Sequence, residues 1–201
     1  MVVASPALVG LEILRIVSQN NRYDAWRNHS IIRQSNPVTC GPAAVATLFT
    51  FYFKENSTEE EMAKLSGTYE QKTTTLLGLR NACRAKDHEA TGYRMTLLQL
   101  LHQIETSGVP VVAHLKEPSL HYVLVIGKVR NVILVSDPTV GNISVDAADF
   151  ERQWSGVALV VRPTSNAGSS RVLIDERKKS AEARLEILHR AATLMSSTRF
   201  Y

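Results

Sequence analysis

The character of the chain changes at Gly108, and this change constrains the fold more than any other feature of the sequence. Before Gly108, apolar residues recur with helical spacing, whereas after it runs of β-branched residues alternate with turns that contain Pro, Gly or Asn. These runs predict strands over residues 109–115, 121–129, 132–136, 143–145 and 157–162. The dipeptide Arg130-Asn131 predicts a tight antiparallel hairpin between two of them. Helices followed by strands, rather than alternating with them, predict an α+β domain.

The helical patterns divide the chain into a core and two extensions. Before Gly108 they cover residues 6–18, 39–53, 58–66, 74–86 and 96–107. The pattern over 39–53 is apolar almost all round, which is typical of a helix buried in the core. We therefore expect a helical N-terminal extension over 1–30, a core domain over 31–163, and a linker with a C-terminal helix over 164–201.

The C-terminal pattern, over 171–197, follows a Ser- and Gly-rich linker. It carries an apolar stripe that needs cover from the chain's own domain, from the N-terminal helix or from a second copy in a homodimer. The stripe consists of Leu173, Ile174, Leu185, Leu188 and Leu194.

The composition excludes several classes of protein. The chain has 201 residues, 44% of them hydrophobic, and two cysteines, so it is neither disordered throughout nor a disulfide or four-cysteine zinc scaffold. Its net charge is +4, and its one tight basic cluster, Arg177-Lys178-Lys179, lies among acids, so no nucleic-acid binding is expected. No paired histidines or cysteines have metal-ligand spacing, so we expect no metal and no other cofactor. No apolar stretch is long enough for a membrane span.

Cys40 is the first residue that suggests chemistry. It begins the buried helical pattern, where the positive end of the helix dipole favours a thiolate. Gly41, which follows it, would allow the close approach of a substrate backbone, and Pro42 suits the first turn. A cysteine in this place is either a small buried hydrophobic residue or a nucleophile. Cys83 lies inside a helical pattern, away from either end, and is interpreted as structural.

A thiolate nucleophile needs a base and a group that orients the base. His121 begins one strand of the predicted hairpin, and Asp137 ends the other, just before a proline. Counted outward from Arg130-Asn131, their positions differ by about three residues, which a bulge or twist can absorb, so the two side chains can meet at one end of the sheet. Gln34, in the loop before Cys40, carries an amide that can bind a developing oxyanion.

Together these residues resemble a known family. The segment 34–44, with the sequence QSNPVTCGPAA, is similar to the active-site segment of the bacteriocin-processing double-glycine leader peptidases. His121-Tyr122-Val123 and, 16 residues beyond His121, Asp137-Pro138 match as well, and the resemblance covers residues 33–162. These are papain-like cysteine peptidases, usually fused to the front of an ABC exporter. The resemblance implies a papain-like fold in which a helical N-terminal half packs on an antiparallel sheet, with helical terminal extensions.

The resemblance also implies a role for each matching residue. Cys40 would be the nucleophile, His121 the general base and then acid, and Asp137 the group that orients His121. Gln34 would complete the oxyanion hole with the backbone N–H of Cys40. The substrates would be secreted bacterial precursor peptides or proteins that are cut after a Gly-Gly pair.

This chain departs from the family because it has no predicted membrane span and no GxxxxGK phosphate loop. We therefore expect a free-standing peptidase, similar to those that serve bacterial secretion systems, including systems for functional amyloid. Its partners would be a peptide or protein substrate and components of the secretion system. The expected compartment is the periplasm, with the cytoplasm as the alternative.

Two other functions stay open. Relatives that have lost the nucleophile only hold the leader peptide, but the presence of Cys40, His121, Asp137 and Gln34 argues against a binding module of that kind. The same Cys-His-Asp chemistry also serves amide hydrolysis and acyl transfer on papain-like folds.

Overall fold

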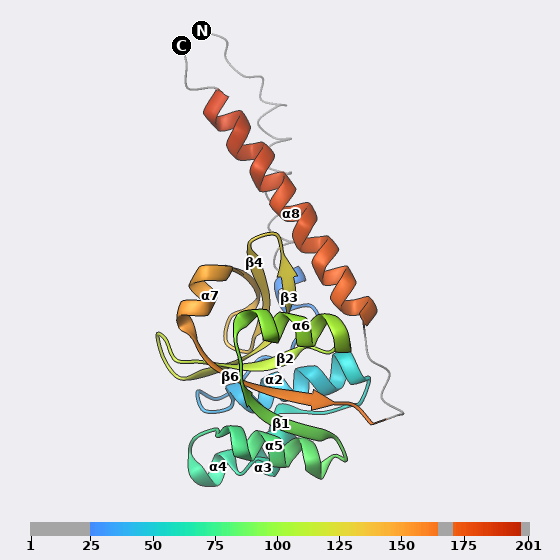
Figure 1. Cartoon of the computed structure of the whole chain (residues 1–201). Coiled ribbons are helices and arrows are strands. Elements are labelled where there is room, and N and C mark those ends of the chain that lie inside the picture. The colour runs from blue at the N-terminus through green and yellow to red at the C-terminus, as the bar shows by residue number, and fades with distance from the viewer. Residues whose placement is uncertain (1–24, 165–170, 198–201) are drawn as a thin grey trace, which may run out of the picture.

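A six-stranded antiparallel sheet forms the centre of the molecule (Figure 1). The computed structural model describes residues 25–164 and 171–197. The strands are β1 (Glu89–Arg94), β2 (Val111–Leu115), β3 (His121–Val129), β4 (Val132–Asp137), β5 (Gly141–Asp146) and β6 (Trp154–Arg162). They lie side by side in the order β1-β6-β2-β3-β4-β5. The five predicted strands and the Arg130-Asn131 hairpin are therefore confirmed, and so is the α+β class.

The helices before β2 follow the predicted patterns, except for the short helix α4. They are α2 (Cys40–Thr47), η1 (Leu48–Phe53), α3 (Glu59–Leu65), α4 (Thr68–Gln71), α5 (Leu76–Ala85) and α6 (Leu97–Ser107). The pattern over 39–53 is one continuous helical stretch whose last part, η1, is wound as a π-helix. All eight residues of α2 are buried, as its apolar circumference predicted. The predicted helix over 6–18 lies outside the described residues.

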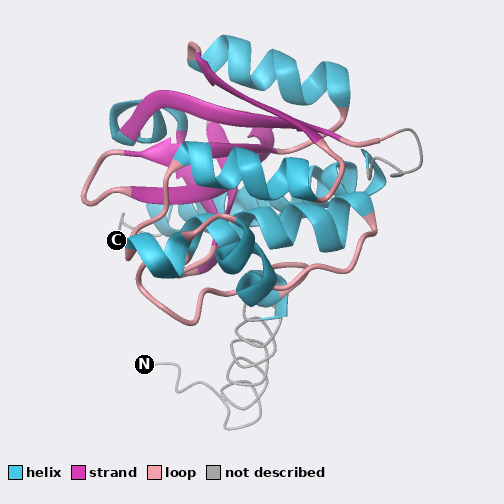
Figure 2. Ribbon diagram, turned by 90° about the horizontal axis from the view of Figure 1, so that it is seen from below, coloured by secondary structure: helices cyan, strands magenta, loops and turns pink. Residues whose placement is uncertain are grey.

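Helices cover both sides of the strand layer (Figure 2). Strand β3 contacts α2 as well as α6 and the C-terminal helix α8 (Arg171–Ser197). Its residues from Tyr122 to Gly127 are consequently buried without interruption. A strand that is covered on both faces reads as a continuous apolar run, which is the pattern that β3 shows in the sequence.

The sequence did not predict three elements: strand β1, the four-residue helix α4 and helix α7 (Ala147–Gln153). β1 is an edge strand that pairs only with β6 in the described sheet, and Ala90 is its one buried residue. Its sequence, EATGYR, lacks the β-branched run that marks a covered strand. α7 is a short helix capped by the side chain of Asp146, which accepts a hydrogen bond from the N–H of Ala148 at 2.9 Å.

The first half of α8 packs on the central domain. Leu173 and Ile174 from the predicted stripe belong to the core, as does Ala181, and Ile174 is only 3% exposed. The second half of the helix extends away from the body (Figure 1), and there Leu188 is 65% exposed. Part of the stripe thus finds cover on the chain's own domain, while the side chain of Leu194 lies outside the described residues.

No helix within residues 25–164 and 171–197 combines the length and the apolar character that crossing a membrane requires.

The unequal burial along α8 gives a matched pair of stability variants. Ile174→Ala is expected to lower the free energy of unfolding by about 2–5 kcal/mol, because it leaves a cavity beside β3. Leu188→Ala removes a similar side chain from an exposed position and should change that free energy by less than about 0.5 kcal/mol. Urea unfolding of both variants measures the difference, and equal losses would show that the two halves of α8 do not differ in this way.

Candidate active site

Cys40 occupies the first position of α2 and is 6% exposed. The N-cap, Thr39, makes no side-chain cap, so the free N–H groups of the first turn are available beside the sulfur. Gly41 is required by the close packing of α2 against Thr74 and α5. A Cβ on Gly41 would lie 2.5 Å from Cγ2 of Thr74 and 2.8 Å from Cδ1 of Leu79. The absence of a side chain at Gly41 therefore lets α2 approach α5. From the sequence, the same absence was expected to make room for a substrate backbone.

The loop that leads into Cys40 is held from two sides. Oε1 of Glu59, the first residue of α3, accepts a hydrogen bond from the N–H of Ser35 at 2.8 Å and contacts the Thr39 hydroxyl. On the other side, the Thr74 hydroxyl donates to the carbonyl oxygen of Val38 at 2.6 Å. These contacts fix the backbone that leads into Cys40. The sequence predicts only a helix over 58–66 here, because the contact of Glu59 with the loop is tertiary.

His121 and Asp137 meet across the β3–β4 pair. Nε2 of His121 lies 2.9 Å from Oδ1 of Asp137, which leaves Nδ1 as the ring nitrogen for the thiol. The contact depends on a bulge, since Gly127 pairs with Leu134 but Val125 pairs with Val135, so that one extra residue lies on β3.

The bulge decides which face of the sheet each side chain occupies. Beyond the bulge Leu124 pairs with Ser136, so Val123 lies opposite Asp137, and His121 shares the face of Val123. Without the extra residue, Asp137 would lie opposite Leu124 and would point to the other face from His121. The hairpin count placed His121 about three residues farther from the turn than Asp137. One of these residues is the bulged residue, and the other two separate His121 from Val123, the residue opposite Asp137.

The Asp137 carboxylate is itself fixed. Its Oδ1 accepts hydrogen bonds from the backbone N–H groups of Thr139 at 2.7 Å and Val140 at 3.3 Å. Burial raises the pKa of Asp137, but the hydrogen bond with His121, the charge of His121 and these two N–H groups together hold it below its ordinary value. Asp137 is therefore ionised and immobile beside the imidazole.

His121 is the basic member of the cluster. Burial lowers its pKa, but hydrogen bonds with Asp137 and Cys40, together with the negative charges of both, outweigh burial and raise the pKa from 6.5 to about 9. At neutral pH the ring is an imidazolium between two acidic groups. An imidazolium in this position is the partner that a cysteine thiolate requires.

Gln34 joins the nucleophile loop to the loop after β4. Its Oε1 accepts a hydrogen bond from the Thr139 hydroxyl at 2.8 Å, and its Nε2 donates one N–H to the carbonyl oxygen of Asn36 at 2.9 Å. The second N–H of the amide has no partner in the described residues. The structure thus holds the side chain in one orientation, and Thr139, which the sequence analysis did not identify, is the residue that does so.

The remaining cysteine and a second buried histidine are engaged elsewhere. Burial raises the pKa of the Cys83 thiol to about 12, so Cys83 is an inert core residue, as predicted. His88 stacks on Phe53 and lies 2.7 Å from Oε2 of Glu55. Neither residue takes part in the cluster of Cys40, His121 and Asp137.

The chain is similar in sequence to a protein family and to several known proteins. The Peptidase C39 family matches residues 28–166. An uncharacterized protein of Methanothermobacter thermautotrophicus is 32% identical over 131 residues, which are 65% of this chain and 87% of that protein. The mesentericin-Y105 transport/processing ATP-binding protein of Leuconostoc mesenteroides is 28% identical over 170 residues, or 82% of this chain. The match covers only 22% of that longer protein.

Two solved structures share the fold. The peptidase domain of Streptococcus ComA, a bi-functional ABC transporter, superposes with a TM-score of 0.61 at 23% identity and covers 68% of this chain and 100% of that domain. A double glycine motif protease from an AMS/PCAT transporter, solved in complex with the leader peptide, gives a TM-score of 0.57 at 23% identity, over 69% of this chain and 96% of that one. These likenesses confirm the predicted papain-like fold.

The geometry around His121 predicts its titration. The ring should titrate with a midpoint near pH 9, and the imidazolium that faces Cys40 should be lost as the pH rises through that value. Because this pKa is above the unfolded value of 6.5, its contribution to stability is complete below pH 6.5 and disappears as the pH approaches 9. Asp137→Asn removes the carboxylate charge and should move the midpoint down. NMR titration of the His121 ring measures both values, and an unchanged midpoint in Asp137→Asn would contradict this account.

The contact of Glu59 with the nucleophile loop predicts a second effect. Glu59→Gln weakens the acceptor of the Ser35 N–H and should lower the free energy of unfolding by about 1–2 kcal/mol. The Ser35 amide should also exchange its hydrogen faster. Glu60→Gln is the matched control, since Glu60 lies in the same first turn of α3 and has the same interaction with the helix dipole. Equal exchange of the Ser35 amide in both variants would exclude a positioning role for Glu59.

Proposed function

Since the chain belongs to the Peptidase C39 family, we propose that it is a cysteine endopeptidase that cuts precursor peptides or proteins after a Gly-Gly pair. One observation carries the proposal: His121, which lies 2.9 Å from the Asp137 carboxylate, also interacts with Cys40, the first residue of a buried helix. This arrangement supplies a nucleophile, an acid-base group and an orienting group in the order that thiol peptidases need.

The first half of the reaction is acylation. The Cys40 thiolate attacks the scissile carbonyl carbon, and a C–S bond forms while the carbonyl oxygen becomes an oxyanion. The backbone N–H of Cys40 and the second N–H of the Gln34 amide stabilise this oxyanion. When the intermediate collapses, the C–N bond breaks and the leaving amine takes a proton from Nδ1 of His121.

The second half is hydrolysis of the thioester. Neutral His121 accepts a proton from a water molecule, whose oxygen attacks the thioester carbonyl carbon. The C–S bond then breaks, which releases the new carboxyl terminus and restores the thiolate-imidazolium pair. Throughout the cycle Asp137 holds Nε2 of His121 and balances the imidazolium charge.

The substrate class rests on the resemblance and on the relatives. One similar structure is that of a double glycine motif protease in complex with the leader peptide, and one similar protein is a transport/processing protein for mesentericin-Y105. We extend this to secreted bacterial precursors, in support of a secretion or amyloid-export system, with the periplasm as the site of action and the cytoplasm as the alternative.

The test uses the full chain and two synthetic peptides that differ at one position. The first ends its leader with Gly-Gly, and in the second the last glycine is replaced by leucine. Wild type should cut the first peptide after Gly-Gly and leave the second intact, as mass spectrometry of the products will show. Cys40→Ala should lose at least about a thousandfold in rate, whereas Cys83→Ala should retain the wild-type rate.

Alkylation distinguishes the peptidase from a binding module. Iodoacetamide at neutral pH should label Cys40 much faster than Cys83, because Cys40 faces an imidazolium and Cys83 is fully buried. Tight binding of the Gly-Gly peptide without cleavage, together with equal labelling of the two cysteines, would replace the peptidase with a leader-binding module. Transfer of the acyl group to an added amine in preference to water would indicate an acyltransferase.

A further inference from the structure

Arg177 of α8 carries a guanidinium group into the interior of the protein, where the residue is only 5% exposed. Within the described residues, no carboxylate forms an ion pair with it. The titratable group that acts on its charge is Tyr52, which is neutral at pH 7 because burial raises its pKa to about 12. A buried cation without a counter-ion costs stability, so overall stability does not explain the presence of Arg177.

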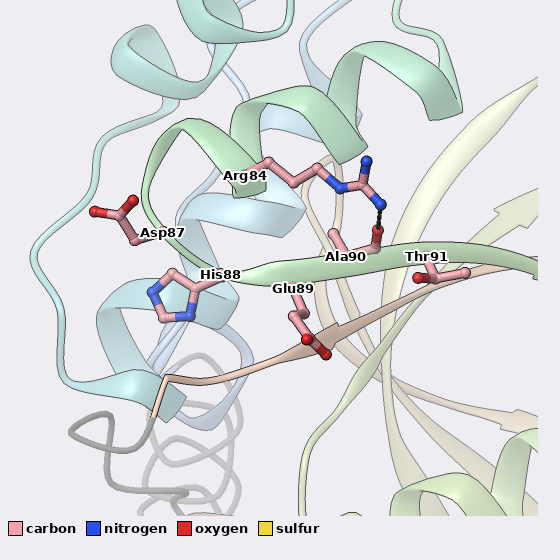
Figure 3. Close-up of a pocket in the computed structure, with 6 residues that line it drawn as sticks. All are labelled: Arg84, Asp87, His88, Glu89, Ala90 and Thr91. Carbon is pink, nitrogen blue, oxygen red and sulfur yellow. Dashed lines mark hydrogen bonds between the residues drawn. The ribbon is translucent and has the colours of Figure 1, made fainter.

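Arg84 on α5 shows the same kind of contact in an ordinary setting (Figure 3). It donates to the carbonyl oxygen of Ala90 at 3.1 Å, but it is exposed to water. It also lines a hollow together with the acidic residues Asp87 and Glu89. Arg177, by contrast, is buried, and the acceptors that the described residues offer it are backbone carbonyl oxygens.

The acceptors of Arg177 belong to the turn formed by His29 and Ser30, which we call the His29–Ser30 turn. Nη2 of Arg177 donates to the carbonyl oxygen of His29 at 2.6 Å and to that of Ser30 at 3.3 Å. Ser30 has a φ of 53°, in the left-handed region that residues with a side chain rarely adopt. One guanidinium group therefore holds a turn whose backbone conformation is unfavourable by itself.

The His29–Ser30 turn is connected to the Asp137 carboxylate. The carbonyl oxygen of His29 also accepts a hydrogen bond from Nδ2 of Asn142 at 2.9 Å. Oδ1 of the same amide accepts one from the hydroxyl of Ser136 at 2.5 Å. Ser136 directly precedes Asp137 in β4, so a displacement of the turn would also displace the carboxylate that orients the imidazole.

The same turn is connected to Gln34. Residues 31–33 alone separate Ser30 from Gln34. Within this short stretch, the N–H of Ile32 donates to Oγ1 of Thr47 in α2 at 3.0 Å. At its end, the N–H of Gln34 donates to the carbonyl oxygen of Pro138 at 3.0 Å. The turn thus fixes where the stretch begins, and with it the position of the Gln34 amide.

We infer that Arg177 is a positioning residue for the peptidase reaction: it fixes the His29–Ser30 turn and, through that turn, the Asp137 carboxylate and the Gln34 amide. The inference rests on the proposed function and adds to it a residue that does not touch the substrate. Arg177 lies beyond residue 166, where the match to the Peptidase C39 family ends. A helix outside the matched residues would therefore hold the catalytic groups in place.

The test compares two substitutions on α8 in the full chain. Arg177→Met keeps an unbranched apolar side chain but removes the charge and the hydrogen-bond donors. Arg171→Met is the matched control, because Nη2 of Arg171 also donates to a backbone carbonyl oxygen, that of Glu105, at 2.8 Å. This contact lies at the end of α6 and not at the His29–Ser30 turn.

Hydrogen exchange measured by NMR tests the positioning without any substrate. In Arg177→Met the amides of Gln34 and Thr139 should exchange at least about tenfold faster than in wild type, and in Arg171→Met they should not. The amide of Ala113, which is fully buried in the middle of β2, should not exchange faster in either variant, because the loss of an uncompensated buried charge does not lower overall stability. Unchanged exchange at Gln34 and Thr139, or equal acceleration at Ala113, would overturn the inference.

Titration of the His121 ring gives a readout that a purely structural role would not change. If Arg177→Met loosens the Asp137 carboxylate, the midpoint of His121 should fall below the wild-type value, because the hydrogen bond and the charge of Asp137 help to raise it. Arg171→Met should keep the wild-type midpoint. An unchanged midpoint in Arg177→Met would overturn the inference.

Cleavage of the Gly-Gly peptide connects this positioning to the reaction. Arg177→Met should lower kcat by at least about tenfold and leave KM within about twofold, because misplaced catalytic groups affect the transition state more than substrate binding. Arg177→Lys keeps a cationic donor and should recover part of kcat. A change confined to KM would overturn the inference. Absence of cleavage by wild type, with the exchange and titration results as expected, would instead count against the proposed function alone.

Discussion

The extra residue at Ile126 determines where the chemistry of this domain can occur. A β-strand alternates its side chains, so a single inserted residue exchanges the two faces of everything beyond it. In β3 this exchange turns His121 toward the face that carries α2 and the face on which Asp137 lies. The Arg130-Asn131 turn sets the register at one end of the hairpin, and the bulge resets it before the other end. Burial of α2 then brings Cys40 to the same place, because every residue of that helix is buried against the sheet and its covering helices.

The segment before Cys40 and the loop after β4 stabilise each other. Nε of Arg27 donates to the carbonyl oxygen of Val140 at 2.5 Å, and Nε of Arg33 donates to that of Pro138 at 3.1 Å. The buried amide of Asn142 returns the contact by donating to backbone carbonyls, including that of His29 at 2.9 Å. The Gln34 side chain completes this set through Thr139. Cys40 and Asp137 are thus positioned by one shared network rather than by two independent loops, which explains how residues so distant in sequence keep a fixed geometry.

The sequence predicted the elements with strong periodicity and missed those that depend on their surroundings. The strands β2, β3, β4, β5 and β6 and the long helices carry clear patterns, and the residues from Gln34 to Ala44 carry the family resemblance. Strand β1 has charged residues and Gly92 where a covered strand has β-branched ones, so no local rule identifies it. The contacts of Glu59 and Thr139 arise only when α3 and the β4–β5 loop approach the nucleophile segment. The need for a glycine at position 41 also depends on tertiary contacts, because Thr74 and Leu79 fill the space where a side chain would lie.

Helix α8 has a mechanical consequence. Its first half is anchored by the buried Arg177, whose Nη2 donates to the carbonyl oxygen of His29 at 2.6 Å, and by apolar residues in the core. Its 27 residues correspond to about 40 Å of continuous helix, and the second half extends away from the body. Because the helix is fixed at one end only, a group joined to its far end is held at a set distance and direction from the cluster of Cys40, His121 and Asp137. This geometry makes the far end of α8 a suitable attachment point for a tether or a probe that must stay clear of that cluster.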